Sequence, residues 1–377
     1  MKIIIAPDSF KGSISAQDLC ASIKYGIKKI MPNAEVLSIP LADGGEGTME
    51  NIVEATGGRI ITTNVLNPIQ QSLTAAYGVL GDEKTAVIEM AQASGLPLLT
   101  ESEKNPLVTT SFGTGQLIKD ALDKGYRRFI IGLGGSATND GGMGILRALG
   151  MEFYDENHNP LPEGGGLLSE LALIDESSFD SRIYESEILV ASDVTNPLCG
   201  ENGASAIFGP QKGATPDMVR TLDHSLNHFG EIILKQKGIE VRTIPGGGAA
   251  GGIGAALVTF LNATIHSGIE LIMKEVQFEQ KIVGADLIFT GEGKLDHQTL
   301  SGKVIMGVSK MAQKHNIPVV ALCGQLEINE NALQQLGILS AFSVIKGPCT
   351  LDTAFEKTAE WTTDTVEKIM RLIVHYS

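Results

Sequence analysis

The chain has 377 residues, a length at which a single hydrophobic core usually stops growing, so two domains are expected. Hydrophobic residues make up 43% of the sequence and charged residues 19%, a balance that excludes a disordered or fibrous protein. The formal net charge of -15 excludes extended binding to a nucleic-acid backbone or to an anionic membrane surface. A small anion can still bind where backbone N–H groups and a few lysines converge.

Nothing in the sequence predicts export or a membrane anchor. The N-terminal apolar run is too short for a secretory signal, and no stretch approaches the ~18 consecutive apolar residues of a membrane span. The cysteines at positions 20, 199, 323 and 349 form no close pair of the kind that binds zinc or builds a disulfide framework. We therefore expect a cytoplasmic protein with reduced thiols.

The N-terminal segment has the pattern of two successive strand–helix units. A short apolar run at residues 3–6 is followed by a helical pattern with apolar residues on one face. Residues 36–39 repeat the apolar run and lead through a glycine-rich loop at 42–48 into a short helix. Two such units predict a parallel sheet that binds ligands at the carboxyl ends of its strands.

The middle of the chain follows a different pattern. Residues 72–80 and 85–90 are neighbouring apolar segments that favour a β-hairpin. Two further strands, at 129–133 and 188–192, are separated by long glycine-rich segments without a clear period. We interpret residues 72–283 as an inserted central α/β domain of different topology.

The last third of the chain returns to alternating strands and helices, which is typical of a doubly wound parallel sheet. The expected strands are 286–290, 318–323 and 339–345, and the expected helices are 304–315, 329–336 and 353–374. We therefore predict an α/β protein with two domains. Residues 1–71 and 284–377 together form one discontinuous domain, and 72–283 form the other.

Glycine-rich segments follow or precede most of these elements. They are 8–13 (DSFKGS), 43–48 (DGGEGT), 132–142 (GLGGSATNDGG), 192–203 (SDVTNPLCGENG), 245–254 (PGGGAAGGIG) and 291–302 (GEGKLDHQTLSG). Glycine lets backbone N–H groups converge on an anion, and a helix N-terminus adds a favourable dipole. A tight turn without a ligand explains any one of them, but the whole set indicates phosphate or carboxylate binding.

No segment matches a Walker A loop, the protein-kinase motifs or a dinucleotide fingerprint. A nucleotide site in this chain would therefore have another design.

Acidic residues and lysines within these segments supply groups that phosphoryl transfer requires, namely oxygen ligands for a metal, a proton acceptor and phosphate-binding cations. The acids are Asp8, Asp43, Glu46, Asp140, Asp193, Glu292 and Asp296. Of the lysines, Lys11 and Lys294 lie in these segments, and Lys212 (PQKGA) and Lys303 (SGKV) lie in further glycine-containing loops. Asp193 directly follows a buried strand, the usual place for a catalytic or metal-binding acid in an α/β protein. A turn-forming aspartate or a solvated lysine is the alternative for each.

Several of these segments closely resemble the motifs of the bacterial glycerate kinase type-1 family. They are IAPDSFKGS, PLADGGEGT, GLGGSATNDGG, ASDVTNPLCGENGA with FGPQKGA, PGGGAAGGIGAAL and FTGEGKLDHQTLSGK. They occur in order from the first residues to beyond Lys303, so the resemblance covers nearly the whole chain. It implies a magnesium-dependent enzyme that phosphorylates D-glycerate with ATP, typically to 2-phosphoglycerate. It also implies a flavodoxin-like domain built from both chain ends and a central α/β domain.

Within this resemblance we assign roles as hypotheses. Asp193, Lys294 and Asp296 are expected to be catalytic, and Asp193 and Glu292 to bind Mg²⁺. The residues expected to bind glycerate are Ser9, Lys11, Asp43, Glu46 and Lys303. Those expected to bind the phosphates of ATP are Gly134, Gly135, Ser136, Ala137, Thr138, Asn139, Gly247 and Gly248. Direct in-line transfer would take place in an interdomain cleft whose closure excludes water.

Three alternatives stay open at this point. The chain could phosphorylate another small hydroxy-acid, give 3-phosphoglycerate instead, or serve as a non-catalytic sensor of phosphorylated metabolites. The expected partners are small molecules, glycerate and ATP, and a homodimer is also considered.

Overall fold

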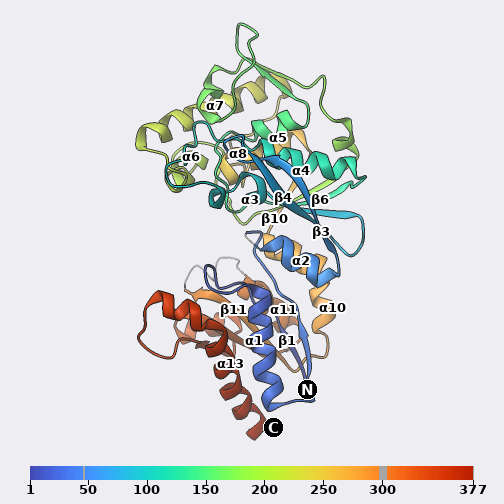
Figure 1. The fold of residues 1–377 in the computed structure, drawn as a ribbon, viewed down its shortest axis with the longest axis vertical. Coiled ribbons are helices and arrows are strands. Elements are labelled where there is room, and N and C mark those ends of the chain that lie inside the picture. The colour runs from blue at the N-terminus through green and yellow to red at the C-terminus, as the bar shows by residue number, and fades with distance from the viewer. Residues whose placement is uncertain (46, 297–303, 377) are drawn as a thin grey trace. The chain divides into compact units, whose positions relative to one another are not determined.

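The computed structural model describes residues 1–45, 47–296 and 304–376 (Figure 1). Two predicted site residues, Glu46 and Lys303, lie outside the described residues. The chain divides into two compact units. Unit 1 comprises Met1–Asp43, Glu50–Thr56 and Ile269–Ser377, and unit 2 comprises Gly44–Met49 and Gly57–Gly268.

Unit 1 is built on a five-stranded parallel sheet to which both ends of the chain contribute, blue and orange in Figure 1. Its strands are β1 (Lys2–Ile5), β2 (Glu35–Ser38), β11 (Leu287–Leu295), β12 (Val319–Leu326) and β13 (Ser340–Ser343). The order across the sheet is β13-β12-β11-β1-β2, and all neighbours are parallel. Counted along the chain within this unit, the order is 2-1-3-4-5, as in flavodoxin. The predicted fold class is confirmed.

Helices cover both faces of this sheet, because its strands bury apolar side chains on both sides. Strand β12 alternates accordingly: Val320 and Leu322 belong to one core, and Ala321 and Cys323 to the other. The first core contains residues of α1 (Ala16–Ile30) and α13 (Leu351–Tyr376), which pack against each other, and the second contains residues of α11 (Val304–Lys314) and α12 (Glu330–Leu336). The remaining helices are α2 (Thr48–Thr56), α9 (Gly268–Glu275) and α10 (Phe278–Ile282).

Unit 2 contains a mixed six-stranded sheet of order β10-β9-β6-β5-β4-β3. Its strands are β3 (Arg59–Leu66), β4 (Ser72–Val79), β5 (Thr85–Glu89), β6 (Arg128–Gly132), β9 (Glu187–Ala191) and β10 (Thr264–His266), and β7 (Glu152–Tyr154) pairs separately with β8 (Leu173–Asp175). Strands β5, β6, β9 and β10 are parallel neighbours, whereas β3 and β4 are antiparallel. The predicted hairpin of β4 and β5 is confirmed.

The helices of unit 2 are α3 (Ala91–Ser94), α4 (Phe112–Asp123), α5 (Met143–Ala148), α6 (Ala204–Phe208), α7 (Pro216–Lys237) and α8 (Ala249–Phe260). No helix within the described ranges is both long and apolar enough to cross a membrane.

The division into units differs from the predicted domain boundaries at two places. Residues 57–71 are predicted to join the chain ends, but β3 pairs with β4 along its whole length and lies in unit 2. Residues 269–283 are predicted to join the central part, but this segment lies in unit 1, where the Lys281 amine donates to the carbonyl of Ala55 and the Lys281 carbonyl accepts from Lys2. Single-sequence patterns do not show which sheet a short strand or helix joins.

Strand β11 is longer than predicted. The sequence pattern ended the strand at residue 290 and treated the following glycines as a loop. Pairing with β12 instead continues through Glu292 opposite Cys323 and Lys294 opposite Gln325. The acid and the lysine are therefore held on a hydrogen-bonded strand.

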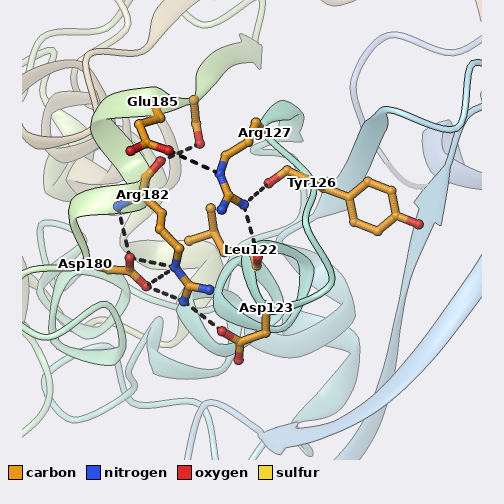
Figure 2. A network of polar contacts seen from close by, with 8 residues as sticks. Leu122, Asp123, Tyr126, Arg127, Asp180, Arg182 and Glu185 are labelled. Atoms are coloured by element: carbon orange, nitrogen blue, oxygen red, sulfur yellow. Dashed lines mark hydrogen bonds and ion pairs between the residues drawn. The ribbon is translucent and has the colours of Figure 1, made fainter.

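A network of polar contacts fixes the approach to β9 in unit 2 (Figure 2). Arg182 donates from Nη2 to Asp123 at the end of α4, at 2.7 Å, and to Asp180, at 2.6 Å. Arg127 donates to the carbonyl of Leu122 at 3.0 Å. Hydrogen bonds from Arg182 lower the pKa of Asp180. The network ties the end of α4 to the turn that leads into β9, the strand that Asp193 follows.

Candidate active site

A cavity of about 910 Å³ lies at the carboxyl ends of the strands of unit 1. Its lining comes from the loop after β1, from the ends of β11, β12 and β13, and from the start of α13. Strand order reverses between β1 and β11, and ligands of open α/β sheets bind at such a point. The loop after β1 is fastened to β11 by a hydrogen bond from the Asp8 N–H to the carbonyl of Gly291, at 2.8 Å.

Among the acids that line this cavity, Asp8 differs most from a solvated carboxylate in its burial and its pKa. Its side chain is buried, and one oxygen accepts from the Ser9 N–H at 2.6 Å. Burial raises the pKa of Asp8 to about 7, with further increases from the charges of Asp43 and Glu292, while Ser9 and Lys11 oppose the shift. A carboxyl group with a pKa near neutrality can accept a proton from a substrate hydroxyl.

Lys11 is surrounded by acids. Its Nζ lies 3.6 Å from an oxygen of Asp43. Burial lowers the pKa of Lys11, but the charges of Asp43, Asp8 and Glu292 outweigh burial and raise it overall. The lysine is therefore a permanent cation at neutral pH, able to contact a phosphate or a carboxylate.

The acids that line this cavity, Asp8, Asp43 and Glu292, are of the residue type that binds Mg²⁺. The part of the chain that the structure describes contains no group of three or more His, Cys, Asp or Glu side chains placed to hold a metal. A magnesium ion that bridges substrate phosphates needs only one or two carboxylates. Burial is the main cause of the raised pKa of Asp8, and the negative charges of Asp43 and Glu292, which a divalent cation would offset, add to it.

Lys294 also lines the cavity and forms two ion pairs. Its Nζ lies 3.3 Å from Asp296 and 2.7 Å from Glu327. Hydrogen bonds with Glu327 and Asp296 raise the pKa of Lys294. The predicted catalytic pair Lys294 and Asp296 is therefore brought together, and Glu327 is an additional acid that no sequence motif marked.

The structure thus gathers in one unit most of the residues that the sequence assigned to catalysis and glycerate. The cavity is lined by Ser9, Lys11, Asp43, Glu292 and Lys294. Asp8 received no role from the sequence, although a signal existed: like Asp193, it comes just after a buried strand.

Residues 136–139 of the glycine-rich segment in unit 2 are packed into their own unit, whereas Gly135 is exposed. Ala137 donates from its backbone N–H to Ser94, at 2.9 Å, and the Asn139 side chain donates to Ser205, at 2.9 Å. Thr138 and Asn139 have no exposed surface. Within the described residues, Thr138 Oγ1 and Asn139 Oδ1 have no hydrogen-bond partner.

Asp140 and Lys212 support this segment from inside. Asp140 accepts from the Ser111 N–H and hydroxyl, both at 2.8 Å, and burial raises its pKa although these hydrogen bonds oppose the shift. Lys212 is 1% exposed and donates to the carbonyl of Thr138 at 2.6 Å. Burial lowers the pKa of Lys212 to about 7, against the charge of Asp140. The sequence places both residues in glycine-containing loops, and the structure buries them.

Gly247 and Gly248 make backbone contacts within unit 2. The Gly247 N–H donates to Ile244 at 2.9 Å, and the Gly248 N–H donates to Asn196 at 3.0 Å. A Cβ on Gly248 would lie 2.1 Å from the Pro197 carbonyl oxygen. Close packing therefore explains why residue 248 is glycine. The phosphate contacts expected at Gly247 and Gly248 stay a prediction.

Asp193 lies at the carboxyl end of β9 in unit 2, where it is exposed and accepts from the Gly268 N–H at 3.1 Å. Its predicted partner in metal binding, Glu292, belongs to unit 1.

Comparisons with known proteins all point to one family. A model of the glycerate kinase family matches residues 3–374. A protein named glycerate kinase from Bacillus subtilis (strain 168) is 48% identical over 369 residues, 98% of this chain and 97% of that protein. A glycerate 2-kinase from Escherichia coli (strain K12) is 48% identical over 355 residues, 94% of this chain and 93% of that protein. A crystal structure from Salmonella typhimurium LT2, assigned as glycerate kinase 2, matches with a TM-score of 0.90 and 46% identity over 100% of this chain and 98% of that chain.

Proposed function

Because the chain belongs to the glycerate kinase family, we propose that it transfers the γ-phosphate of ATP to D-glycerate and forms 2-phosphoglycerate in the cytoplasm. The observation that carries the proposal is the cavity of unit 1. It combines a buried acid, a lysine and further carboxylates at the point of the sheet where ligands bind.

Asp8 is the proposed proton acceptor. As the glycerate 2-hydroxyl oxygen forms its bond to the γ-phosphorus, the bond from that phosphorus to the bridging oxygen of ADP breaks, and the hydroxyl proton passes to the Asp8 carboxylate. Lys11 balances the charge of the phosphate or of the glycerate carboxylate. Glu292 is the proposed magnesium ligand; the metal, when bound, would neutralise phosphate charge.

We propose further roles for the other residues that the sequence assigned; some are alternatives to Asp8 and Glu292, and some act beside them. Asp193 is the alternative base and metal ligand, and Lys294 with Asp296 would stabilise transferring charge. Ser9 and Asp43 would contact glycerate hydroxyls. The segment from Gly134 to Asn139, with Gly247 and Gly248, is the sequence-based candidate for phosphate binding. We further propose that the two units behave as two domains.

Phosphorus NMR of a reaction with ATP, Mg²⁺ and D-glycerate tests this proposal. We expect the signals of ADP and 2-phosphoglycerate. A 3-phosphoglycerate signal would contradict the proposed product, and faster turnover with another hydroxy-acid, such as lactate, would contradict the substrate. Binding of ATP and glycerate without any product would identify a sensor.

A further inference from the structure

The cavity of unit 1 is longer than glycerate requires. Its lining residues come from the ends of four neighbouring strands, β1, β11, β12 and β13. Three spacings of about 4.8 Å make this floor about 14 Å wide. A three-carbon acid spans roughly 5 Å, given C–C bonds of about 1.5 Å. Glycerate therefore fills only part of the cavity.

The cavity has a charged side and an apolar side, and different elements of the fold contribute them. The loop after β1 and strand β11 contribute the charged groups Asp8, Lys11, Glu292 and Lys294, and the loop after β2 contributes Asp43. The end of β12 and the first turns of α13 contribute the apolar side chains Leu326 (39% exposed), Leu351 (67%) and Phe355 (38%). Large apolar side chains that are exposed together around one cavity indicate a ligand with an apolar surface.

Phe355 lies close to the charged end. A Cβ on Gly12, the residue after Lys11, would be 3.6 Å from the Phe355 ring. The Ser13 hydroxyl lies 2.7 Å from that of Thr358, one turn further along α13. The apolar wall and the charged group thus belong to one continuous surface.

We infer that the adenosine of the phosphoryl donor binds in unit 1, against Leu326, Leu351 and Phe355, with its triphosphate extending to Lys11 and Glu292. This inference rests on the proposed function, since it takes ATP as the donor. Glycerate has no apolar surface to cover these side chains, whereas a purine and a ribose do. The base and the γ-phosphate of ATP are separated by the ribose and two further phosphates, which suits a cavity whose floor is about 14 Å wide.

This placement competes with the sequence-based expectation that the segment from Gly134 to Asn139, with Gly247 and Gly248, holds the nucleotide phosphates. Two cysteines distinguish the alternatives. Cys349 is exposed and lines the cavity of unit 1. Cys199 is half-buried in unit 2, two residues from Pro197, whose carbonyl lies against Gly248. Cys20 and Cys323 are buried, and burial raises the pKa of both thiols, so they react slowly.

The experiment measures the rate at which N-ethylmaleimide modifies each cysteine of the full chain, by mass spectrometry of its peptides. With ATP at about ten times its Kd, we expect modification of Cys349 to slow about tenfold, because about a tenth of the sites stay empty. Adenosine alone should also protect Cys349, whereas tripolyphosphate and glycerate should not. Protection of Cys199 with no change at Cys349 would overturn the inference.

Turnover measured on the same preparation separates this inference from the proposed function. If the enzyme phosphorylates glycerate but saturating ATP leaves the Cys349 rate unchanged, the placement of adenosine is wrong and the function stands. If no donor supports turnover while adenosine still protects Cys349, the nucleoside site stands and the proposed function is wrong.

Substitutions of the apolar wall give an independent measurement. Leu351→Ala and Phe355→Ala should each weaken ATP binding about tenfold, because each removes apolar surface that the nucleoside would cover. Inhibition by tripolyphosphate should be unchanged. Leu372→Ala is the matched control, since Leu372 lies on the same helix, is 61% exposed and does not line the cavity. Equal affinities for ATP in all three variants would overturn the inference.

Discussion

The carboxyl edge of the unit 1 sheet and the glycine-rich segments of unit 2 share one sequence pattern but use it differently. In unit 1 the glycines and acids after the strands border a cavity, and Asp8 and Glu292 face charged neighbours there. In unit 2 Asp140 and Lys212 are buried and make hydrogen bonds within the unit, although Asp193 is exposed. Glycine after a strand therefore permits close approach either to a ligand or to the protein's own backbone.

The largest expected effect tests the packing role of glycine in unit 2. Gly251 has a φ of 69°, and a Cβ there would lie 2.2 Å from the Thr138 carbonyl oxygen. We expect Gly251→Ala to lower the free energy of unfolding by about 3 kcal/mol or more, combining left-handed strain with overpacking.

Gly238→Ala is the matched control for this substitution. Gly238 has a φ of 71°, but among the described residues a Cβ there would meet no atom within 4 Å. Only the backbone strain of about 1 kcal/mol therefore applies. Denaturant unfolding of both variants measures the difference. Equal losses would mean that close packing does not explain Gly251.

The next effect concerns the acid of unit 1. Asp8→Asn keeps the shape of the side chain but removes the proposed proton acceptor, so kcat should fall about a hundredfold or more. Glu156→Gln, at an exposed position of unit 2, should leave kcat unchanged. If Asp193→Asn instead lowers kcat about a hundredfold while Asp8→Asn keeps kcat within a few-fold of wild type, the proton acceptor lies in unit 2. Unit 2 rather than unit 1 would then carry the catalytic acid.

The buried lysine of unit 2 predicts a dependence of stability on pH. Because burial lowers the pKa of Lys212 to about 7, the folded chain binds fewer protons at this group above that pH than the unfolded chain does. The free energy of unfolding should therefore rise with pH above about 7, by about 2 kcal/mol between pH 7.5 and 9 relative to Lys212→Met. Urea unfolding across this range measures the slope; parallel curves for the two proteins would contradict a neutral buried amine.

The smallest expected effect concerns Lys294. Lys294→Met should lower kcat/KM about tenfold, since one cation near the transferring phosphate is lost. Lys29→Met is the control, because Lys29 forms a comparable exposed ion pair with Glu367 away from the cavity. Both variants should keep the stability of the wild type within about 1 kcal/mol, as exposed ion pairs contribute little. If Lys294→Met and Lys29→Met have the same kcat/KM, Lys294 takes no part in the reaction.

Local patterns in the sequence were sufficient to predict the parallel sheet of unit 1. The apolar period of α1, with Leu19, Ile23 and Ile27 buried, and the short strands around it are local features that tertiary packing preserved. Strand β11 is longer than predicted because its pairing with β12, which the local sequence does not show, places residues such as Glu292 in a strand rather than a loop.

The candidate site could be predicted only in part. The acids and lysines after β1 and within β11 stood in recognisable motifs. The burial of Lys212 depends on its contact with Thr138, far away in the sequence, and no spacing reveals it. The apolar wall of the cavity was missed for the same reason, because Leu351 and Phe355 stand outside every glycine-rich motif and reach the site only through the fold.

The placement of Glu292 on a paired strand has a consequence for how such an enzyme can diversify. The strand is buried through Glu292 and pairs with β12 at that residue, so its geometry is shared with the core and resists change. Leu351 and Phe355 are exposed on the first turns of a helix and do not belong to the buried core. With the nucleoside placed as proposed, substitutions on the helix would change the preferred nucleotide while the proposed reacting groups on and beside the strand stay the same.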